Sequence, residues 1–282
     1  MPLILDGKIA SQAVKDGLKK ELDKVRDRAV PGLAVVLVGD NPASHVYVGM
    51  KKKACEALGY YSQEHKLPAR TTQDELLKII GQLNADPKIH GILVQLPLPE
   101  HLHSAQVIDA IDPRKDVDGL HPANLGKLLA GEKGLRPCTP LGVMALLDHF
   151  QIPLAGRKAV VIGRSNLVGK PLGLLLLEAN ATPSFCHSKT KNLAEVVRQA
   201  EIVVAAIGKP RFVSADMIQP GAVVVDVGTS KAQDGKLLGD VDYVSVAPIA
   251  SAITPVPGGV GPMTIALLLK NTFQAFREQT GL

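Results

Sequence analysis

Short runs of Val, Ile, Leu and Ala recur along this chain, and segments with helical periodicity separate them. In the first half, apolar runs at 32–38 and 91–94 flank helical segments at 44–61 and from Asp74 onward, with a polar strand near 62–67. Such alternation predicts a parallel sheet with right-handed crossovers, because parallel strands need a long connection between them. The chain is therefore expected to fold as an α/β protein.

A second alternating series begins near Lys158 and predicts a Rossmann-type, doubly wound α/β domain with a parallel sheet. Its expected strands are 158–163, 182–188, 201–208 and 222–228, and its expected helices are 168–180 and 192–200. The boundary should fall between the two series, which gives domains 1–138 and 139–262. A last helical segment, 263–282, lies beyond the second series, and we expect it to pack back on the first domain.

Composition narrows the class of partner. The 282 residues carry a net charge of +5, which suits an anionic small molecule, but the basic residues do not cluster with aromatic ones as in nucleic-acid-binding proteins. No apolar run approaches the roughly 20 residues of a membrane-spanning helix, and the N-terminus lacks the pattern of a signal peptide. We therefore expect no nucleic-acid partner and no membrane partner. With 46% hydrophobic but only 3% aromatic residues, the core must be aliphatic.

The three cysteines are Cys55, Cys138 and Cys186, and no two of them have the spacing of a zinc site or a disulfide framework. No cluster of His, Cys, Asp or Glu has metal-ligand spacing either, so we predict no metal. A reducing cytoplasm is the simplest setting for such cysteines.

A glycine loop, VVIGRSNLVGKPLG, follows the first strand of the second series and opens a helix. This is the context in which backbone N–H groups bind a pyrophosphate. The loop is not a P-loop, because five residues separate Gly163 from Gly169 and Pro171 follows Lys170. A purely structural glycine-rich turn is the alternative.

The strand after this loop ends in CHSKT and carries no acidic residue of the kind that holds the ribose hydroxyls of NAD. Ser188 and Lys189 at that end, with Arg164 in the glycine loop, suit a ribose 2′-phosphate. The pattern therefore favours NADP over NAD. Alternatively, His187 and Lys189 simply face solvent.

Tyr47 and Lys51 are four residues apart in the first predicted helix, so a phenol and an amine share one helix face. They form either a catalytic pair or part of an ordinary solvated basic face.

Several separated motifs occur together in this chain: QLPLP from Gln95, DVDGLHPAN with Asp118, RPCTP from Arg136, GRSNLVGKP from Gly163, and ITPVPGGVGPMT from Ile253. In this order, and over essentially the whole length, the chain resembles the bifunctional methylenetetrahydrofolate dehydrogenase/cyclohydrolase family of the FolD type.

The resemblance implies NADP-dependent oxidation of 5,10-methylenetetrahydrofolate, followed by hydrolysis to 10-formyltetrahydrofolate, in one-carbon metabolism and purine biosynthesis. It also implies a cytoplasmic homodimer, formed through a sheet edge near the strand after Pro183. The two domains are expected to form a cleft, with folate on the first and NADP on the second.

The resemblance also implies roles for individual residues. Lys51 would be the central catalytic group, Tyr47 would stack on or orient the folate, and Gln95 would help set the protonation state of Lys51. Asp118 would bind the amide and amine donors of the pterin edge. Further folate contacts would come from Val94, Gln95, Leu96, Pro255, Gly258, Gly259 and Pro262. NADP would be held by Gly163, Arg164, Ser165, Gly169, Ser188 and Thr229.

One departure from the family pattern is clear. Thr229 and Ser230 follow Gly228, where the family usually has Ile-Asn. A cyclohydrolase with weakened dehydrogenase activity is therefore an alternative, and a non-catalytic folate- or nucleotide-binding protein is another. A short-chain dehydrogenase also uses Tyr-x-x-x-Lys, but there the glycine loop precedes the tyrosine, which is the reverse of the order found here.

Overall fold

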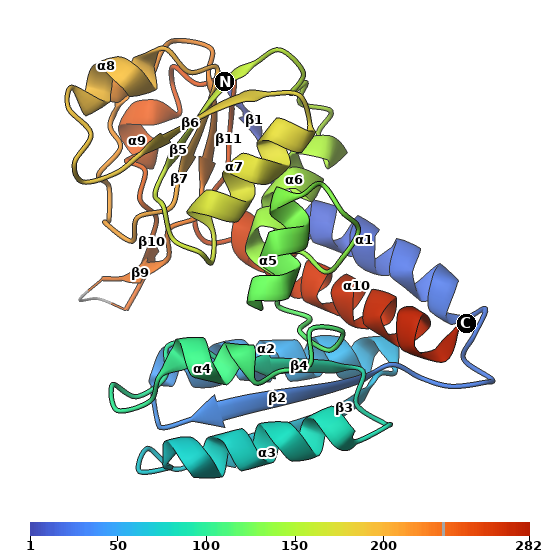
Figure 1. Ribbon diagram of the computed structural model, residues 1–282. Helices are drawn as coiled ribbons and strands as arrows, with labels where there is room; N and C mark the ends of the chain where they lie inside the picture. The colour runs from blue at the N-terminus through green and yellow to red at the C-terminus, as the bar shows by residue number, and fades with distance from the viewer. Residues whose placement is uncertain (233–234) are drawn as a thin grey trace. The chain divides into compact units, whose positions relative to one another are not determined.

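The computed structural model describes residues 1–232 and 235–282, and the chain divides into two compact units (Figure 1). One unit, called here the three-stranded unit, comprises residues 14–138 and 265–282. The other, the six-stranded unit, comprises residues 1–13 and 139–264. Each half is an α/β fold built on a parallel sheet, which confirms the predicted fold class.

The sheet of the three-stranded unit has the order β3–β2–β4, with all strands parallel. Its strands are β2 (Gly32–Val38), β3 (Tyr61–Leu67) and β4 (Gly91–Val94), joined by α2 (Pro42–Leu58) and α3 (Gln73–Ala85). These are the elements that the apolar runs and helical periodicity predict. Two shorter helices follow, α4 (Ser104–Asp109) and α5 (Pro122–Leu129).

Alternate residues of β2 supply two hydrophobic cores, because successive side chains of a strand point to opposite faces. Leu33, Val35 and Leu37 pack with α1 (Gly7–Leu22), α2 and α10 (Val260–Thr280). Ala34, Val36 and Val38 pack with α3 and α4 on the other face. All seven residues of β2 are buried, so the central strand reads as a continuous apolar run.

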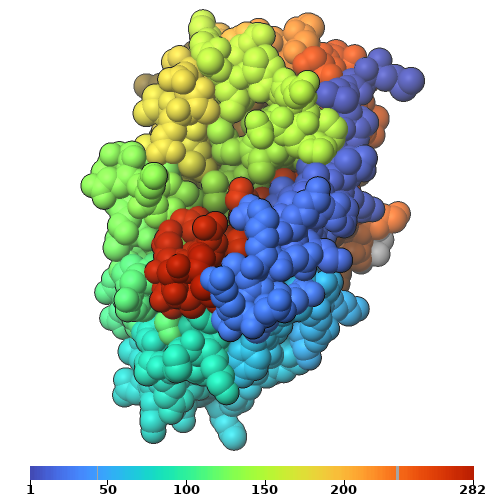
Figure 2. Space-filling view, turned by 90° about the vertical axis from the view of Figure 1, so that its right-hand side faces the viewer, coloured from blue at the N-terminus to red at the C-terminus, as the bar shows by residue number. Residues whose placement is uncertain are grey.

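The last helix belongs to this core, as the sequence predicted for the end of the chain. Leu268, Phe273 and Phe276 of α10 are buried in the first cluster. In the space-filling view this red segment lies beside the blue N-terminal segment (Figure 2), and Arg277 pairs with Glu21 at 3.8 Å.

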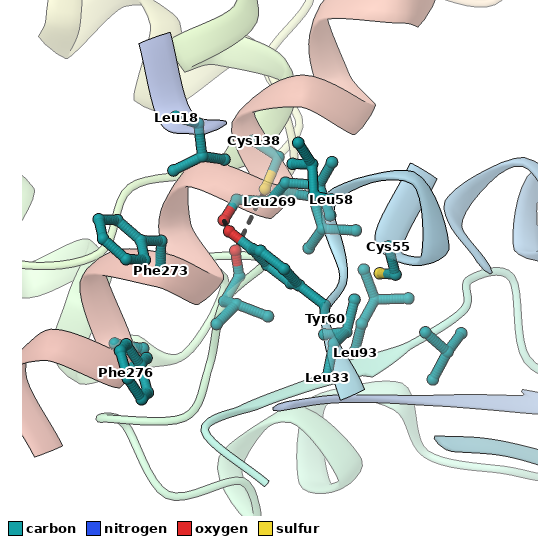
Figure 3. Close-up of a cluster of buried hydrophobic side chains, with 14 of the residues drawn as sticks. Leu18, Leu33, Cys55, Leu58, Tyr60, Leu93, Cys138, Leu269, Phe273 and Phe276 are labelled. Atoms are coloured by element: carbon teal, nitrogen blue, oxygen red, sulfur yellow. Dashed lines mark hydrogen bonds between the residues drawn. The ribbon is translucent and has the colours of Figure 1, made fainter. Parts of the chain in front are cut away.

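Tyr60 joins α10 to the sheet of the same unit. Its ring lies among the side chains of the cluster in Figure 3, and its hydroxyl donates a hydrogen bond to the backbone carbonyl of Leu269 at 3.0 Å. Burial raises the pKa of the phenol, so the hydroxyl keeps its proton and remains a donor.

We expect Tyr60→Phe to lower the free energy of unfolding by about 1 kcal/mol, because one buried hydrogen bond is lost while the ring still fills its place. Urea titration followed by circular dichroism measures this change. The matched control is Tyr61→Phe, since Tyr61 is the exposed neighbour. Equal midpoints for the two variants would show that the bond to Leu269 contributes nothing.

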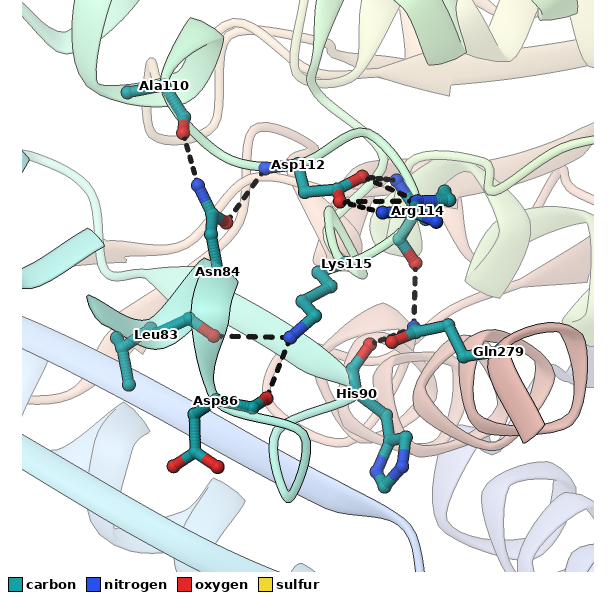
Figure 4. A network of polar contacts seen from close by, with 9 residues as sticks. All are labelled: Leu83, Asn84, Asp86, His90, Ala110, Asp112, Arg114, Lys115 and Gln279. Carbon is teal, nitrogen blue, oxygen red and sulfur yellow. Dashed lines mark hydrogen bonds and ion pairs between the residues drawn. The ribbon is translucent and has the colours of Figure 1, made fainter. Parts of the chain in front are cut away.

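A polar network fixes the loop that follows α4 (Figure 4). Lys115 donates to the carbonyls of Leu83 at 3.2 Å and Asp86 at 2.8 Å, at the C-terminal end of α3. Asn84 donates to the carbonyl of Ala110 and accepts from the N–H of Asp112. The loop is thereby held beside β4.

The sheet of the six-stranded unit has the order β1–β11–β8–β7–β5–β6, with every neighbouring pair parallel. Its strands are β1 (Leu3–Ile4), β5 (Lys158–Ile162), β6 (Thr182–Cys186), β7 (Ile202–Ala205), β8 (Val223–Asp226) and β11 (Ala252–Ile253). Its other elements are α6 (Cys138–His149), which begins at the unit boundary, α7 (Gly169–Glu178), α8 (Leu193–Arg198), η1 (Ala215–Met217), α9 (Tyr243–Val246) and the antiparallel hairpin β9 (Ser230–Lys231) and β10 (Leu237–Leu238).

The N-terminal residues differ from the predicted division. Residues 1–13 belong to the six-stranded unit, because Leu3 and Ile4 pair with Ala252 and Ile253 at the edge of its sheet. The predicted first domain, 1–138, included them. Helix α1 therefore begins in one unit and ends in the other.

Within residues 1–232 and 235–282, no helix has both the length and the apolar character needed to span a bilayer.

Candidate active site

Lys51 lies in the middle of α2, one turn after Tyr47, and its side chain is buried. Its amine donates a hydrogen bond to Gln95 Oε1 at 2.9 Å. Gln95 is the first residue after β4, and its own backbone N–H donates to the carbonyl of Val36. Its side-chain amide also donates to the carbonyl of Leu96 at 2.7 Å, so the oxygen that faces Lys51 has a fixed orientation.

Burial lowers the pKa of Lys51, because an ammonium ion loses hydration in the protein interior. The carboxylate of Asp118 opposes this shift by favouring the charged amine. Burial likewise raises the pKa of Asp118, and the charge of Lys51 opposes that rise. The two side chains are thus an electrostatically coupled pair, and the amine is easier to deprotonate than a lysine in water.

The segment DVDGLHPAN places Asp118. Asp116 is buried, and its Oδ2 accepts hydrogen bonds from the N–H of His121 at 2.8 Å and the side-chain amide of Asn124 at 2.9 Å. His121 caps α5, with its Nδ1 accepting from the N–H of Ala123. His121 therefore has a structural role here.

A second segment of the chain, residues 136–138, supports Asp118. Gly119 has φ of +72°, and a Cβ there would lie 2.2 Å from the backbone carbon of Arg136. Cys138 donates from its backbone to the carbonyl of Asp118 at 3.3 Å, and its thiol donates to the carbonyl of Val117 at 3.1 Å. Asn271 of α10 donates to the carbonyls of Val117 and Arg136.

No local pattern in the chain indicates these supporting contacts, although Cys138 stands in the RPCTP motif. Cys138 is a hydrogen-bond donor, and burial raises the pKa of its thiol. Asn271 lies 154 residues from Val117 in the chain, so no local pattern relates them.

Other predicted folate contacts are distributed between the units. Val94 is buried at the end of β4, and Tyr47 and Leu96 are partly buried in the three-stranded unit. Pro255, Gly258, Gly259 and Pro262 belong to the six-stranded unit. Gly258 accepts a hydrogen bond from the N–H of Gly7 at 2.8 Å, and a Cβ on Gly259 would lie 2.6 Å from the carbonyl oxygen of Pro255.

The glycine loop lies at the carboxyl end of β5. Gly163 has φ of +135°, and a Cβ there would lie 2.4 Å from the carbonyl oxygen of Ala206. A Cβ on Gly169 would lie 2.4 Å from the carbonyl oxygen of Gly163. Ser165 Oγ accepts from the N–H groups of Val168 and Gly169, which fixes the entry into α7. The loop is tightly folded at a helix N-terminus, where a phosphate is favoured.

Arg164 and Ser188 are brought to the same edge of the sheet. Ile162 pairs with Cys186 in neighbouring parallel strands, and Gly163 donates to the carbonyl of Cys186 at 2.9 Å. Arg164 and Ser188 follow these two strand ends, and both are exposed. A cation and a hydroxyl at this edge can bind a phosphate group. Lys189 is also exposed there, as the solvent-facing alternative requires.

Thr229 lies after β8 at the same carboxyl edge of the sheet, and it is exposed. The preceding Gly228 donates from its backbone to Asp226 Oδ1 at 2.9 Å. In the part of the chain that the structure describes, no three His, Cys, Asp or Glu side chains are grouped to hold a metal ion.

A Rossmann-type sheet with a tightly folded glycine loop at a helix N-terminus is typical of enzymes that use a nicotinamide dinucleotide, and the other unit holds a buried lysine–carboxylate pair. Two family models match the chain: the tetrahydrofolate dehydrogenase/cyclohydrolase catalytic domain over residues 5–118, and the NAD(P)-binding domain of the same family over residues 137–280. The chain belongs to the tetrahydrofolate dehydrogenase/cyclohydrolase family.

Individual relatives agree with this assignment. The chain is 57% identical over 276 residues to the bifunctional protein FolD of Moorella thermoacetica, covering 98% of this chain and 99% of the relative. It resembles the crystal structure of FolD from Campylobacter jejuni with a TM-score of 0.96 and 48% identity, covering 99% of both chains. The Trypanosoma brucei enzyme, solved with NADP cofactor and inhibitor, gives a TM-score of 0.94 and 37% identity, covering 98% of both chains.

These findings confirm the family predicted from the sequence motifs. They also confirm the enzyme class, a dehydrogenase and cyclohydrolase of tetrahydrofolate with an NAD(P)-binding domain.

Proposed function

We propose that this chain oxidises 5,10-methylenetetrahydrofolate with NADP and hydrolyses the resulting 5,10-methenyltetrahydrofolate to 10-formyltetrahydrofolate. The observation that carries the proposal is the buried amine of Lys51, hydrogen-bonded to Gln95 and coupled electrostatically to Asp118. Such a group is suited to proton transfer in a family that performs these two reactions.

In the dehydrogenase reaction, bound NADP supplies the acceptor for a hydride from the methylene carbon between N5 and N10. The protein then mainly positions the reacting groups and excludes water. In this proposal the three-stranded unit, 14–138 with 265–282, binds the folate, and residues 139–264 bind the dinucleotide. Within the first of these, Tyr47 orients the folate and Asp118 accepts hydrogen bonds from the pterin edge. The remaining folate contacts are those predicted above.

In the cyclohydrolase reaction, water adds to the methenyl carbon and loses a proton. The bond between that carbon and N5 then breaks, and the hydroxyl proton goes to N5, which leaves the carbon as the formyl group on N10. Lys51 takes part in removing the proton from the attacking water, and its lowered pKa makes the neutral amine more accessible than in a lysine exposed to water. Gln95 keeps the amine in one place through a hydrogen bond of 2.9 Å. Tyr47, one turn earlier on α2, lies on the helix face that carries Lys51.

The first experiment is a comparison of NADP and NAD with 5,10-methylenetetrahydrofolate, following reduced-nicotinamide absorbance, with a separate assay of methenyltetrahydrofolate hydrolysis. Turnover in both assays, faster with NADP, is expected. Hydrolysis without oxidation by NADP or NAD would favour the alternative of a weakened dehydrogenase. The change at Thr229 and Ser230 is the feature that motivates this alternative. The absence of both activities would leave only a binding protein.

Arg164→Ala is expected to raise the KM for NADP by about ten- to a hundredfold while leaving the NAD-dependent rate unchanged. A charge-assisted hydrogen bond to a phosphate contributes about 1.5–3 kcal/mol, and NAD has no 2′-phosphate to lose it. Steady-state kinetics with each dinucleotide measures the effect.

The matched control for this experiment is Arg157→Ala, an arginine of the same unit that lies just before the amino end of β5 and pairs with Glu201. Equal losses with NADP and NAD in the Arg164 variant would contradict a 2′-phosphate contact.

We also propose that the chain is a cytoplasmic homodimer joined through the edge of the six-stranded sheet. β6 is an edge strand, and Phe185 on it is 43% exposed. An exposed edge strand with an apolar side chain is a pairing surface. Light scattering coupled to size-exclusion chromatography distinguishes a dimer from a monomer, and Phe185→Lys should shift a dimer toward monomer.

A further inference from the structure

The six-stranded unit contains two buried carboxylates that have no part in the catalytic roles proposed above. Asp226 is the last residue of β8, and Asp240 follows the β9–β10 hairpin. Their exposed fractions are 3% and 0%. A fully buried acid costs free energy unless other groups compensate its charge, so the presence of two such acids requires a physical explanation.

Asp240 holds the loop that follows β7. Its Oδ2 accepts hydrogen bonds from the N–H of Ile207 at 2.6 Å and from the N–H of Gly208 at 3.0 Å. These are the first and second residues after Ala206, whose N–H still donates to the carbonyl of Ile162 in β5. One carboxylate oxygen therefore fixes two successive N–H groups of this loop.

Asp226 in turn holds Asp240 and the loop that follows β8. Asp226 Oδ1 accepts from the N–H of Gly228 and from the N–H of Asp240, both at 2.9 Å. Asp226 Oδ2 accepts from the N–H of Val241 at 2.8 Å. The two acids thus tie the ends of β7 and β8 to the chain that returns from the hairpin.

Two glycines allow the acids to lie directly against the backbone. A Cβ on Gly228 would lie 2.3 Å from both Cγ and Oδ1 of Asp240, and a Cβ on Gly239 would lie 1.9 Å from Asp226 Oδ2. Neither loop can shift without displacing a carboxylate. The backbone next to Thr229 therefore lies against Asp240 and is hydrogen-bonded to Asp226.

The position of these loops relates them to the dinucleotide. Ligands of doubly wound sheets bind outside the carboxyl ends of the strands, where the strand order reverses. β6 lies on one side of β5, with Arg164 and Ser188 at that end, while β7 and β8 lie on the other side. A dinucleotide whose 2′-phosphate half lies toward β6 presents its nicotinamide half to the loops after β7 and β8.

The buried charges of Asp226 and Asp240 are incompletely compensated by hydrogen bonds, which argues against a purely structural role for the pair. Among the described residues, Asp240 Oδ1 is one of the few buried side-chain atoms without a hydrogen-bond partner. Burial raises the pKa of Asp226 to about 6, and the charge of Asp240 adds to the rise, against the three N–H donors. Buried polar atoms without partners and shifted pKa values of this kind are common at functional sites.

We propose that Asp240, held by Asp226, is a positioning residue for the nicotinamide half of the dinucleotide, and that it serves the dehydrogenase reaction but not the cyclohydrolase reaction. The inference rests on the proposed function. It adds a residue pair that acts on only one of the two reactions, through the loops at 206–208 and 227–229.

The test measures both activities on one preparation of each variant. Asp240→Ala removes the acceptor for two N–H groups and should lower kcat/KM for NADP-dependent oxidation about ten- to a hundredfold, because small misplacements of reacting groups have effects of that size. The cyclohydrolase rate should stay within about twofold of the wild-type rate, the limit we set for no selective effect. Asp240→Asn keeps an oxygen acceptor and should restore most of the dehydrogenase activity.

The control for lost stability is Val197→Ala, which truncates a fully buried side chain of α8 in the same unit. It should lower thermal stability while leaving the ratio of the two activities unchanged. Parallel losses of both activities in Asp240→Ala, or a loss in Asp240→Asn equal to that in Asp240→Ala, would overturn the inference. A wild-type protein that neither binds NADP by calorimetry nor oxidises the folate would instead overturn the proposed function, and the inference with it.

Should Asp240→Ala fail to fold, Gly228→Ala provides a second variant that presses on the same carboxylate from the loop. The selective loss of dehydrogenase activity is expected there as well. Retention of wild-type dehydrogenase activity in a folded Gly228→Ala protein would count against positioning by Asp240.

Discussion

Replacing Lys51 with methionine is expected to lower the cyclohydrolase rate constant at least about a hundredfold, the usual contribution of a general acid or base. Methionine nearly preserves the length and apolar volume of the side chain, so α2 and its packing should persist. The amine that donates to Gln95 and balances the charge of Asp118 would be gone. Hydrolysis of methenyltetrahydrofolate, followed by absorbance under substrate saturation, gives the rate constant.

Lys52→Met and Lys53→Met are the matched controls, because both side chains are exposed on the same helix. These variants should keep rates close to that of the wild type. A Lys51→Met enzyme that remains within a few-fold of wild type would remove lysine chemistry from the mechanism.

Asp118→Asn is expected to raise the KM for both folate substrates by about tenfold or more, since a charge-assisted hydrogen bond to the pterin contributes about 1.5–3 kcal/mol. The same change should lower the pKa of Lys51 further, because the carboxylate of Asp118 now raises that pKa. If the neutral amine is the active form, the rise of the cyclohydrolase rate with pH should move to lower pH.

The pH–rate profile and KM are both measured, with Asp27→Asn, an exposed acid of the same unit, as the control. A rise in KM without movement of the profile would separate substrate binding by Asp118 from any influence on Lys51. Movement of the profile to higher pH would contradict the electrostatic coupling of the pair.

Most of the fold could be predicted from the sequence because its main strands are long enough to show their pattern. The seven buried residues of β2 and the apolar runs of β5, β7 and β8 are such strands. β1 and β11 have two residues each, too few to show any periodicity, and their pairing joins positions about 250 residues apart. For this reason no sequence pattern indicated that residues 1–13 belong to the six-stranded unit.

The candidate site shows the same division between local and distant information. Lys51, Gln95 and Asp118 stand in motifs that can be read in the chain, and the structure brings them together in one unit. The contacts that hold Asp118 come from Cys138 and Asn271. Cys138 stands in the RPCTP motif, but no local pattern relates it to Val117, and Asn271 belongs to no motif named above. The acceptor role of Asp240 depends on loops more than 30 residues away in sequence, so it too needs three-dimensional coordinates.

The place of α10 has a consequence for how the protein emerges from the ribosome. Leu268, Phe273 and Phe276 cover one face of the three-stranded sheet, yet they are synthesised after the whole of the six-stranded unit. During translation, the apolar face of residues 14–138 therefore stays incompletely covered until α10 has been synthesised, while residues 139–264 can already form their own sheet. The unit whose sheet is the first to be encoded in full is the one completed last, and its uncovered face is the surface that a nascent-chain chaperone would meet.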